Sequence, residues 1–176
     1  MPKGAEARRF PCVKFAPFGA LFFGSCMRKL IQSCLLMLAF PFSAVASDLH
    51  SLVLNADFQM AREAVREAIE GAGLVVTAVM PLNQMLVRTA GSLGKGASPF
   101  AEAETIQFCS ARLAWELVEE DATQLSFCPL SLSIYSQQGM PGSVIAWRSP
   151  GRETPARIRG DDLLRELAAK ARLLAN

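Results

Sequence analysis

Residues 130–148 constrain the fold more tightly than any other part of this 176-residue sequence. Residues 130–135 alternate between large apolar side chains and serines before ending in Tyr135, a period of two that is typical of a strand with one buried face. Residues 136–142 contain two glycines and a proline, which favour a tight connection. Residues 143–148 predict the returning strand. The sequence therefore predicts a β-hairpin whose apolar face must be covered by a second layer.

Two amphipathic helices supply candidates for that layer. The first follows Asp57, a typical N-cap residue. Its apolar stripe at helical spacing consists of Ala61, Ala64, Val65, Ala68, Ile69 and Ala72. The second is expected to be capped by Asp161 or Asp162. Its stripe consists of Leu163, Leu164, Leu167, Ala168, Ala171 and Leu174.

Further strands and helices complete the expected fold. Residues 51–54 and 104–109 predict strands, and the continuously apolar residues 74–80 predict a buried strand. A short helix is expected over residues 81–88, and Ser110 is the N-cap residue of another. This mixture predicts an α+β fold: a two-layer sandwich in which helices pack on one face of a mixed or antiparallel sheet.

Residues 27–46 have the pattern of a cleavable export signal. Two basic residues follow Met27, a run of about 13 mostly apolar residues comes next, and three small residues end at Ala46. The apolar run is shorter than the roughly 20 residues that span a bilayer. We therefore expect a periplasmic or secreted protein that is cleaved near Ala46, begins at Ser47 and has no membrane span in its mature form.

The signal divides the chain into three segments. Because a complete signal begins at Met27, we expect residues 1–26 to be upstream sequence added by a misplaced start; the alternative is an extended basic region of the signal. Residues 47–176 then form a single domain. They contain 12 Lys and Arg against 15 Asp and Glu, a net charge of −3, whereas the whole chain carries +2. This weakly acidic balance gives no reason to expect nucleic acid as a partner.

A set of residues in the second half of the chain resembles a known family. The set comprises Phe108-Cys109, Ala114, Asp121, Phe127-Cys128-Pro129 and Tyr135. This pattern resembles the domain-of-unknown-function family numbered 302, over roughly residues 51–150. The resemblance implies a two-layer domain of β-α-β-sheet-α order. It implies no activity, because the family's name states that its function is not established.

Two of the five cysteines, Cys109 and Cys128, lie beyond the export signal. The first alternative for this pair is a structural disulfide, which requires antiparallel strands to bring the two Cα atoms within about 7 Å. The second is a pair of inert, buried thiols. The third is redox or nucleophilic chemistry, because Cys109 precedes a helix N-terminus, where the helix dipole lowers a thiol pKa.

Four arginines form a second candidate site. They are Arg148, Arg152, Arg157 and Arg159, with Glu153 the only acid between the first and the last. Guanidinium groups bind carboxylates and phosphates, so the cluster predicts a contact with an anion or an acidic partner. The alternative is a solvated surface turn.

No complete set of catalytic residues is visible, which favours a non-enzymatic domain that binds a small ligand or an envelope protein. The alternative is a thiol-dependent redox or transfer enzyme that uses Cys109 with Cys128. A third hypothesis is an accessory subunit of an envelope complex, with the arginine turn as its contact. We expect no cofactor, because the glycine-rich residues 90–98 fail the phosphate-loop pattern. We also expect no metal site, because His50 is the only histidine.

Overall fold

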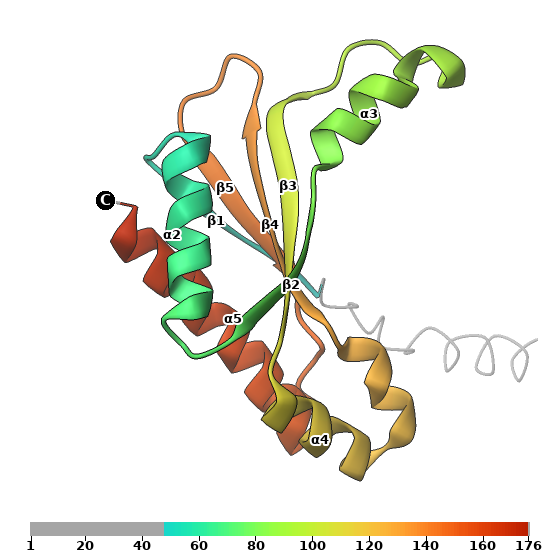
Figure 1. The fold of residues 1–176 in the computed structure, drawn as a ribbon, viewed down its shortest axis with the longest axis vertical. Coiled ribbons are helices and arrows are strands. Elements are labelled where there is room, and N and C mark those ends of the chain that lie inside the picture. Colours follow the sequence, from blue (N-terminus) through green and yellow to red (C-terminus); the bar gives the residue numbers. More distant parts are fainter. Residues whose placement is uncertain (1–47, 176) are drawn as a thin grey trace, which may run out of the picture. The chain divides into compact units, whose positions relative to one another are not determined.

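A five-stranded sheet forms one layer of the fold (Figure 1). The computed structural model describes residues 48–175. The strands are β1 (Leu49–Leu54), β2 (Val75–Met80), β3 (Phe100–Cys109), β4 (Leu130–Gln137) and β5 (Ser143–Arg148). Their order across the sheet is β1-β5-β4-β3-β2, and every neighbouring pair is antiparallel. The export signal predicted over residues 27–46 and the segment 1–26 lie outside the described residues.

Two of the helices, α2 (Phe58–Glu70) and α5 (Pro155–Leu174), form the second layer (Figure 1). The other α-helices are α3 (Leu82–Ala90) and α4 (Ala111–Glu120), and two 3-10 helices are η2 (Gly91–Leu93) and η3 (Ala122–Phe127). Helices α2 and α5 lie side by side along one face of the sheet (Figure 1). The α+β fold with helices packed on an antiparallel sheet is therefore confirmed. None of the helices in the described residues is long and apolar enough to cross a membrane.

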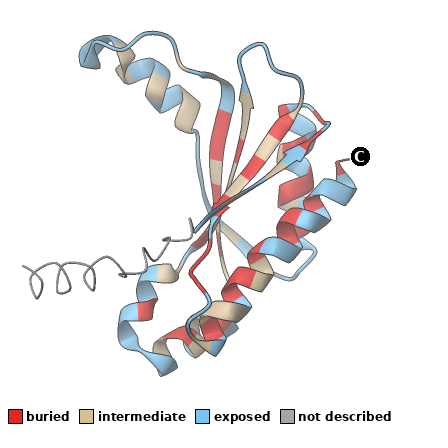
Figure 2. Ribbon diagram, turned by 180° about the vertical axis from the view of Figure 1, so that it is seen from behind, coloured by how far each residue is buried: buried red, intermediate tan, exposed pale blue. Residues whose placement is uncertain are grey.

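The core lies between the sheet and these two helices. Alternate residues of the central strands are fully buried, namely Ile106, Phe108, Leu132, Ile134 and Ile145. The predicted stripe of α2 faces them, since Ala61, Val65, Ala68 and Ile69 have no exposed surface. Figure 2 shows the same pattern as buried segments along α2, α5 and the central strands. The hairpin alternation and the first helix stripe thus correctly predicted a part of the core.

The opposite face of the sheet carries small polar side chains. Thr105 on β3 pairs with Ser133 on β4, which pairs in turn with Ala146 on β5. The hydroxyl oxygens of Thr105 and Ser133 are 2.8 Å apart and share a hydrogen bond. Thr105, Ser133 and Ala146 are half-buried and uncharged, so this part of the sheet presents an uncharged surface.

Two sequence predictions about the elements are wrong. The apolar strand β2 was expected to be buried, but five of its six residues are exposed because it is the edge strand of the sheet. The last helix was expected to begin at Asp161 or Asp162, but α5 begins at Pro155 after the N-cap Thr154. Asp161 faces the core from within the helix, which an N-cap residue does not do.

Candidate functional site

Cys109 and Cys128 are free thiols that do not lie at disulfide distance. The antiparallel pairing of β3 with β4 that a disulfide requires is present. Cys109 is the last residue of β3, whereas Cys128 lies before β4 begins and packs against the core. The structure therefore does not support the alternative of a structural disulfide.

The environment of Cys128 does not activate its thiol. Burial raises the pKa of Cys128, and the neighbouring Cys109 raises it further. A higher pKa lowers the fraction of thiolate, which is the nucleophilic form. This observation fits the alternative of inert thiols, and the alternative of a thiol-dependent enzyme is not supported.

Three of the four candidate arginines have acidic partners within the chain. Arg152 Nη1 lies 2.6 Å from Asp161 Oδ2 and 2.6 Å from Asp162 Oδ1. Arg157 Nη2 lies 2.8 Å from Glu153 Oε2. Its guanidinium carbon also sits 4.7 Å from the ring centroid of Phe127.

Arg159 is tied to the preceding helix. Its Nε donates to Glu116 Oε2 on α4 at 2.7 Å. Apart from Glu153, the acids that pair with these arginines stand outside residues 148–159. The arginine cluster in the sequence therefore does not show which acids most of these arginines pair with. In the described residues, these three arginines form ion pairs, whereas Arg148 does not.

Asp161 takes part in two ion pairs, one with Arg152 and one with Arg165. Its side chain is fully buried and accepts hydrogen bonds from Arg152 at 2.6 Å and from Arg165 at 2.9 Å. Burial alone would raise the pKa of Asp161, but Arg165, the nearby Ser149 and Arg152 together outweigh it and lower that pKa to about 2. The group is a structural anion that joins the β5–α5 connection to α5.

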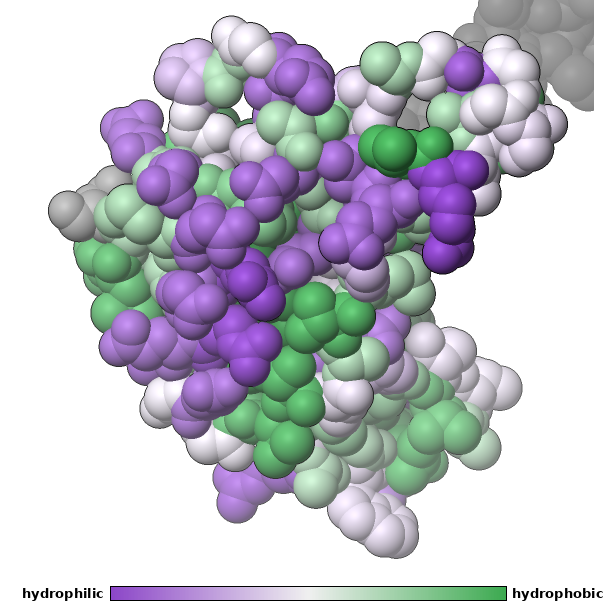
Figure 3. All heavy atoms as spheres, turned by 45° about the horizontal axis from the view of Figure 1, so that its top comes forward, coloured by the Kyte–Doolittle hydropathy of each residue, from purple (hydrophilic) through white to green (hydrophobic). Residues whose placement is uncertain are grey.

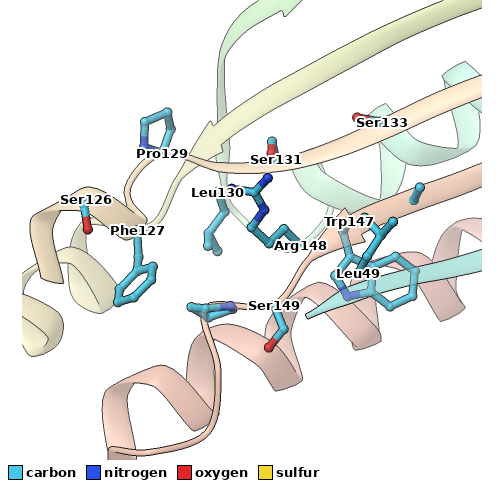
Figure 4. Close-up of a pocket in the computed structure, with 12 residues that line it drawn as sticks. Leu49, Ser126, Phe127, Pro129, Leu130, Ser131, Ser133, Trp147, Arg148 and Ser149 are labelled. Carbon is cyan, nitrogen blue, oxygen red and sulfur yellow. The ribbon is translucent and has the colours of Figure 1, made fainter. Parts of the chain in front are cut away.

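Arg148 is the exception among the four. It is exposed at the end of β5, opposite Leu49 on β1, on the face of the sheet that α2 and α5 do not cover. Within residues 48–175, its guanidinium makes no hydrogen bond or ion pair. Figure 4 shows the side chain reaching from β5 toward Ser131 on β4. It is thus a charged group that is still available to an outside molecule.

A pocket of about 590 Å³ surrounds Arg148. Its lining residues come from β1, β4, β5, η3 and the two connections that follow η3 and β5. They are Leu49, Ser126, Phe127, Pro129, Leu130, Ser131, Ser133, Ala146, Trp147, Arg148, Ser149 and Pro150. Arg148 is the single charged residue among them, and four of the others are serines. The volume lies within the range of about 300–1,000 Å³ that is usual for small-molecule sites.

Trp147 joins the pocket to the interior. It is 7 % exposed, and its indole stacks on His50 with ring centroids 5.5 Å apart. Its Nε1 is buried without a hydrogen-bond acceptor among the described residues. In Figure 4 this nitrogen lies on the side of the ring nearer to Ser149. Buried donors are almost always paired, so Trp147 Nε1 is unusual as a buried donor without a partner in residues 48–175.

Most of this pocket could not be found from the sequence. The sequence pointed to Arg148 but gave no signal for Phe127, Ser131 or Trp147 as its neighbours. These residues lie close together because the strand register places residues that are far apart in the chain next to one another. The serine alternation of residues 130–135 was a usable signal, because it placed Ser131 and Ser133 on the uncovered face.

Comparisons with known proteins agree with the fold and the sequence pattern. The sequence model of the family described as "Domain of unknown function DUF302" matches residues 50–152. No protein with a curated description matches the chain. Among solved structures, the chain is similar to an uncharacterized conserved protein DUF302 from Bacillus stearothermophilus, with 16% identity and a TM-score of 0.57. The similarity covers 74% of this chain and 100% of that one and shows a shared fold. The protein therefore belongs to the DUF302 family, as its Phe-Cys, Phe-Cys-Pro and Tyr135 pattern predicted.

Proposed function

We propose that the protein is a non-enzymatic binding module of the bacterial envelope, and that the pocket beside Arg148 holds a small organic anion. The observation that carries this proposal is the unpaired guanidinium of Arg148 in a pocket whose lining contains no acid. The other candidate arginines are neutralised by carboxylates of the chain itself. Arg148 is therefore free to bind an anion from outside, and a carboxylate or phosphate suits its planar donors.

The rest of the lining indicates what surrounds that anion. Ser126 and Ser131 have hydroxyls that make no hydrogen bond within the described residues, so they are free to donate to a ligand oxygen. Phe127, Pro129 and Pro150 give the pocket apolar walls. Polar groups placed beside apolar walls are typical of sites that orient a small molecule. The ligand that fits best has an apolar body with one anionic end.

The envelope location rests on the sequence. The signal pattern of residues 27–46 favours export, and no apolar run of that length occurs later in the chain. Cys109 and Cys128 are unpaired within the described residues, and burial raises the pKa of Cys128, so the proposed binding role does not rest on a disulfide.

Isothermal titration with 1-naphthoate and with its neutral counterpart, naphthalene-1-carboxamide, tests the proposal. The two probes share an apolar body and differ in charge. We expect the anion to bind at least tenfold more tightly than the amide, because a hydrogen bond to a charged group contributes about 1.5–3 kcal/mol. The Arg148→Gln variant should lose this preference.

The matched control is Arg172→Gln. Arg172 is exposed near the end of α5 and has no ion pair within the described residues. This variant removes the same charge far from the pocket and should keep the preference for 1-naphthoate. If neither probe binds, or if both variants keep the same preference, the pocket is not an anion site and the proposal is wrong.

A further inference from the structure

Residues 80–99, which we call the arm, project from the body of the domain. They comprise the end of β2, α3, η2 and the glycine-rich segment that leads into β3. Figure 1 shows α3 extending away from the sheet and from the layer formed by α2 and α5. The arm is held at its base, where Asn83 Nδ2 donates to Ala101 O at 2.7 Å and Gln138 N donates to Pro99 O at 3.2 Å. The base of the arm is therefore held by hydrogen bonds to Ala101 and Gln138, whereas its outer part projects from the domain.

The outer part exposes large apolar side chains. Helix α3 contains no buried residue, although it is an amphipathic helix with Leu82, Met85 and Leu86 at helical spacing. The exposed apolar residues of the arm are Met80 (50 %), Met85 (40 %), Val87 (60 %) and Leu93 (66 %). Leu93 lies at the tip, directly before Gly94, whose φ of 62° lets the chain turn back. Such a concentration of exposed apolar groups in one projecting segment indicates a contact surface.

The charges of the arm have a single sign. Arg88 and Lys95 are its charged residues, and no Asp or Glu occurs anywhere between Glu70 and Glu102. Neither cation forms an ion pair within the described residues. Figure 3, which brings this end of the molecule forward, shows hydrophobic and strongly hydrophilic residues next to one another on the projecting part. The arm therefore has a net charge of +2, whereas the remainder of residues 47–176 has 10 Lys and Arg against 15 Asp and Glu, a net charge of −5.

We propose that the arm docks the protein on the surface of a bilayer that contains anionic lipid. Cations beside exposed apolar side chains are the combination that binds the interface of such a bilayer. The methionine, valine and leucine side chains would enter the boundary between headgroups and acyl chains. Arg88 and Lys95 would meet the lipid phosphates.

Charge complementarity favours lipid over a second copy of this chain. A twofold contact between two arms would bring Arg88 and Lys95 toward the same residues of the partner, without any acid in the arm to offset them. A Cβ added at Gly91, Gly94 or Gly96 would meet no atom of the described residues within 4 Å beyond its chain neighbours, so the segment around Leu93 has open space beside it. A bilayer accommodates such a segment without a matching groove.

Sedimentation with lipid vesicles tests this proposal. The full chain is expressed for each variant, and the processed protein is purified from the host. N-terminal sequencing confirms that all variants begin at the same residue. Vesicles of phosphatidylcholine with one quarter phosphatidylglycerol are compared with vesicles of phosphatidylcholine alone. We expect binding to the anionic vesicles that weakens about fivefold for each arm cation removed, Arg88→Gln or Lys95→Gln. Leu93→Glu should weaken it at least as much.

The matched control carries Arg172→Gln and Leu173→Glu, which make the same kinds of change on the exposed end of α5. A cooperative thermal unfolding transition, measured for every variant, shows that the variant is folded before it is mixed with vesicles. The proposal holds if the arm variants lose binding to the anionic vesicles and the control keeps it. It is overturned if the parent binds both kinds of vesicle equally or neither, or if control and arm variants lose the same amount. A change in oligomeric state on arm substitution, without vesicle binding, would assign the arm to a protein contact instead.

Discussion

Arg152 Nη1 lies 2.6 Å from Oδ2 of Asp161, although the side chain of Asp161 is fully buried and that of Arg152 is 51 % exposed. The pair spans the connection between β5 and α5, next to the pocket-lining Ser149 and Pro150. A buried carboxylate is tolerated only when it is paired, and here two arginines share it. The stability of this region therefore depends on the ionised form of Asp161.

The first prediction concerns acid unfolding. The pKa of Asp161 is lowered to about 2 in the folded chain, from the ordinary value of 3.8. A depressed carboxyl pKa contributes stability that is present above pH 4 and is lost as the pH falls toward 2. We expect this group to contribute about 2 kcal/mol across that window. Urea unfolding at a series of pH values measures it, and a free energy of unfolding that stays constant between pH 4 and 2 would contradict it.

Asp161→Asn should destabilise the protein by about 2 kcal/mol at neutral pH, because it removes the anion that the two arginines share. The same variant should also lose most of the pH dependence between pH 4 and 2. Asp162→Asn is the control. Asp162 bonds to the same Arg152, but its side chain is 48 % exposed, so we expect a loss of no more than about 1 kcal/mol. Equal losses for the two variants would show that burial of Asp161 does not matter.

Phe108→Ala should cost about 3–5 kcal/mol, because Phe108 is a large, fully buried side chain between the sheet and the helices. Trp115→Ala provides a contrast. Trp115 is 68 % exposed on α4, so its removal should change the free energy of unfolding by no more than about 0.5 kcal/mol. Denaturant unfolding of both variants checks the placement of the core. A larger loss for Trp115→Ala than for Phe108→Ala would contradict it.

The thiols give a fourth prediction. In a Cys109→Ser variant of the described domain, Cys128 should react with a thiol reagent more slowly in the native protein than in urea, because burial raises its pKa. Residues 1–46 contain three further cysteines, so the measurement uses protein from which they are absent or blocked. Native and unfolded protein are compared at the same pH. Equal rates would mean that Cys128 is an accessible thiol.

The fifth prediction tests export. If residues 27–46 are a signal, the chain recovered from the periplasm or medium of a bacterial host begins at Ser47. N-terminal sequencing and the intact mass determine this directly. Replacing Arg28 and Lys29 by glutamine should leave more precursor in the cytoplasm, because the signal loses its basic region. Recovery of an unprocessed chain in the cytoplasm alone would reject export.

Local patterns in the sequence determined much of the fold. The alternation of residues 130–135, the turn residues after it and the stripe from Ala61 to Ile69 each report directly on which side chains face a core. The pattern around Cys109, Cys128 and Tyr135 also identified the family. These features could be predicted because their physical cause lies within a few neighbouring residues.

Only the tertiary structure decided the rest. An apolar strand does not reveal whether it lies in the centre of a sheet or at its edge, so β2 was expected to be buried and is exposed. Two cysteines near antiparallel strands do not reveal whether their sulfur atoms come within bonding distance, and an arginine cluster does not reveal which acids approach from α4 and α5. The pairing of Arg159 with Glu116 and the isolation of Arg148 follow from contacts between distant segments. Such contacts arise when the two layers pack, and no local pattern encodes them.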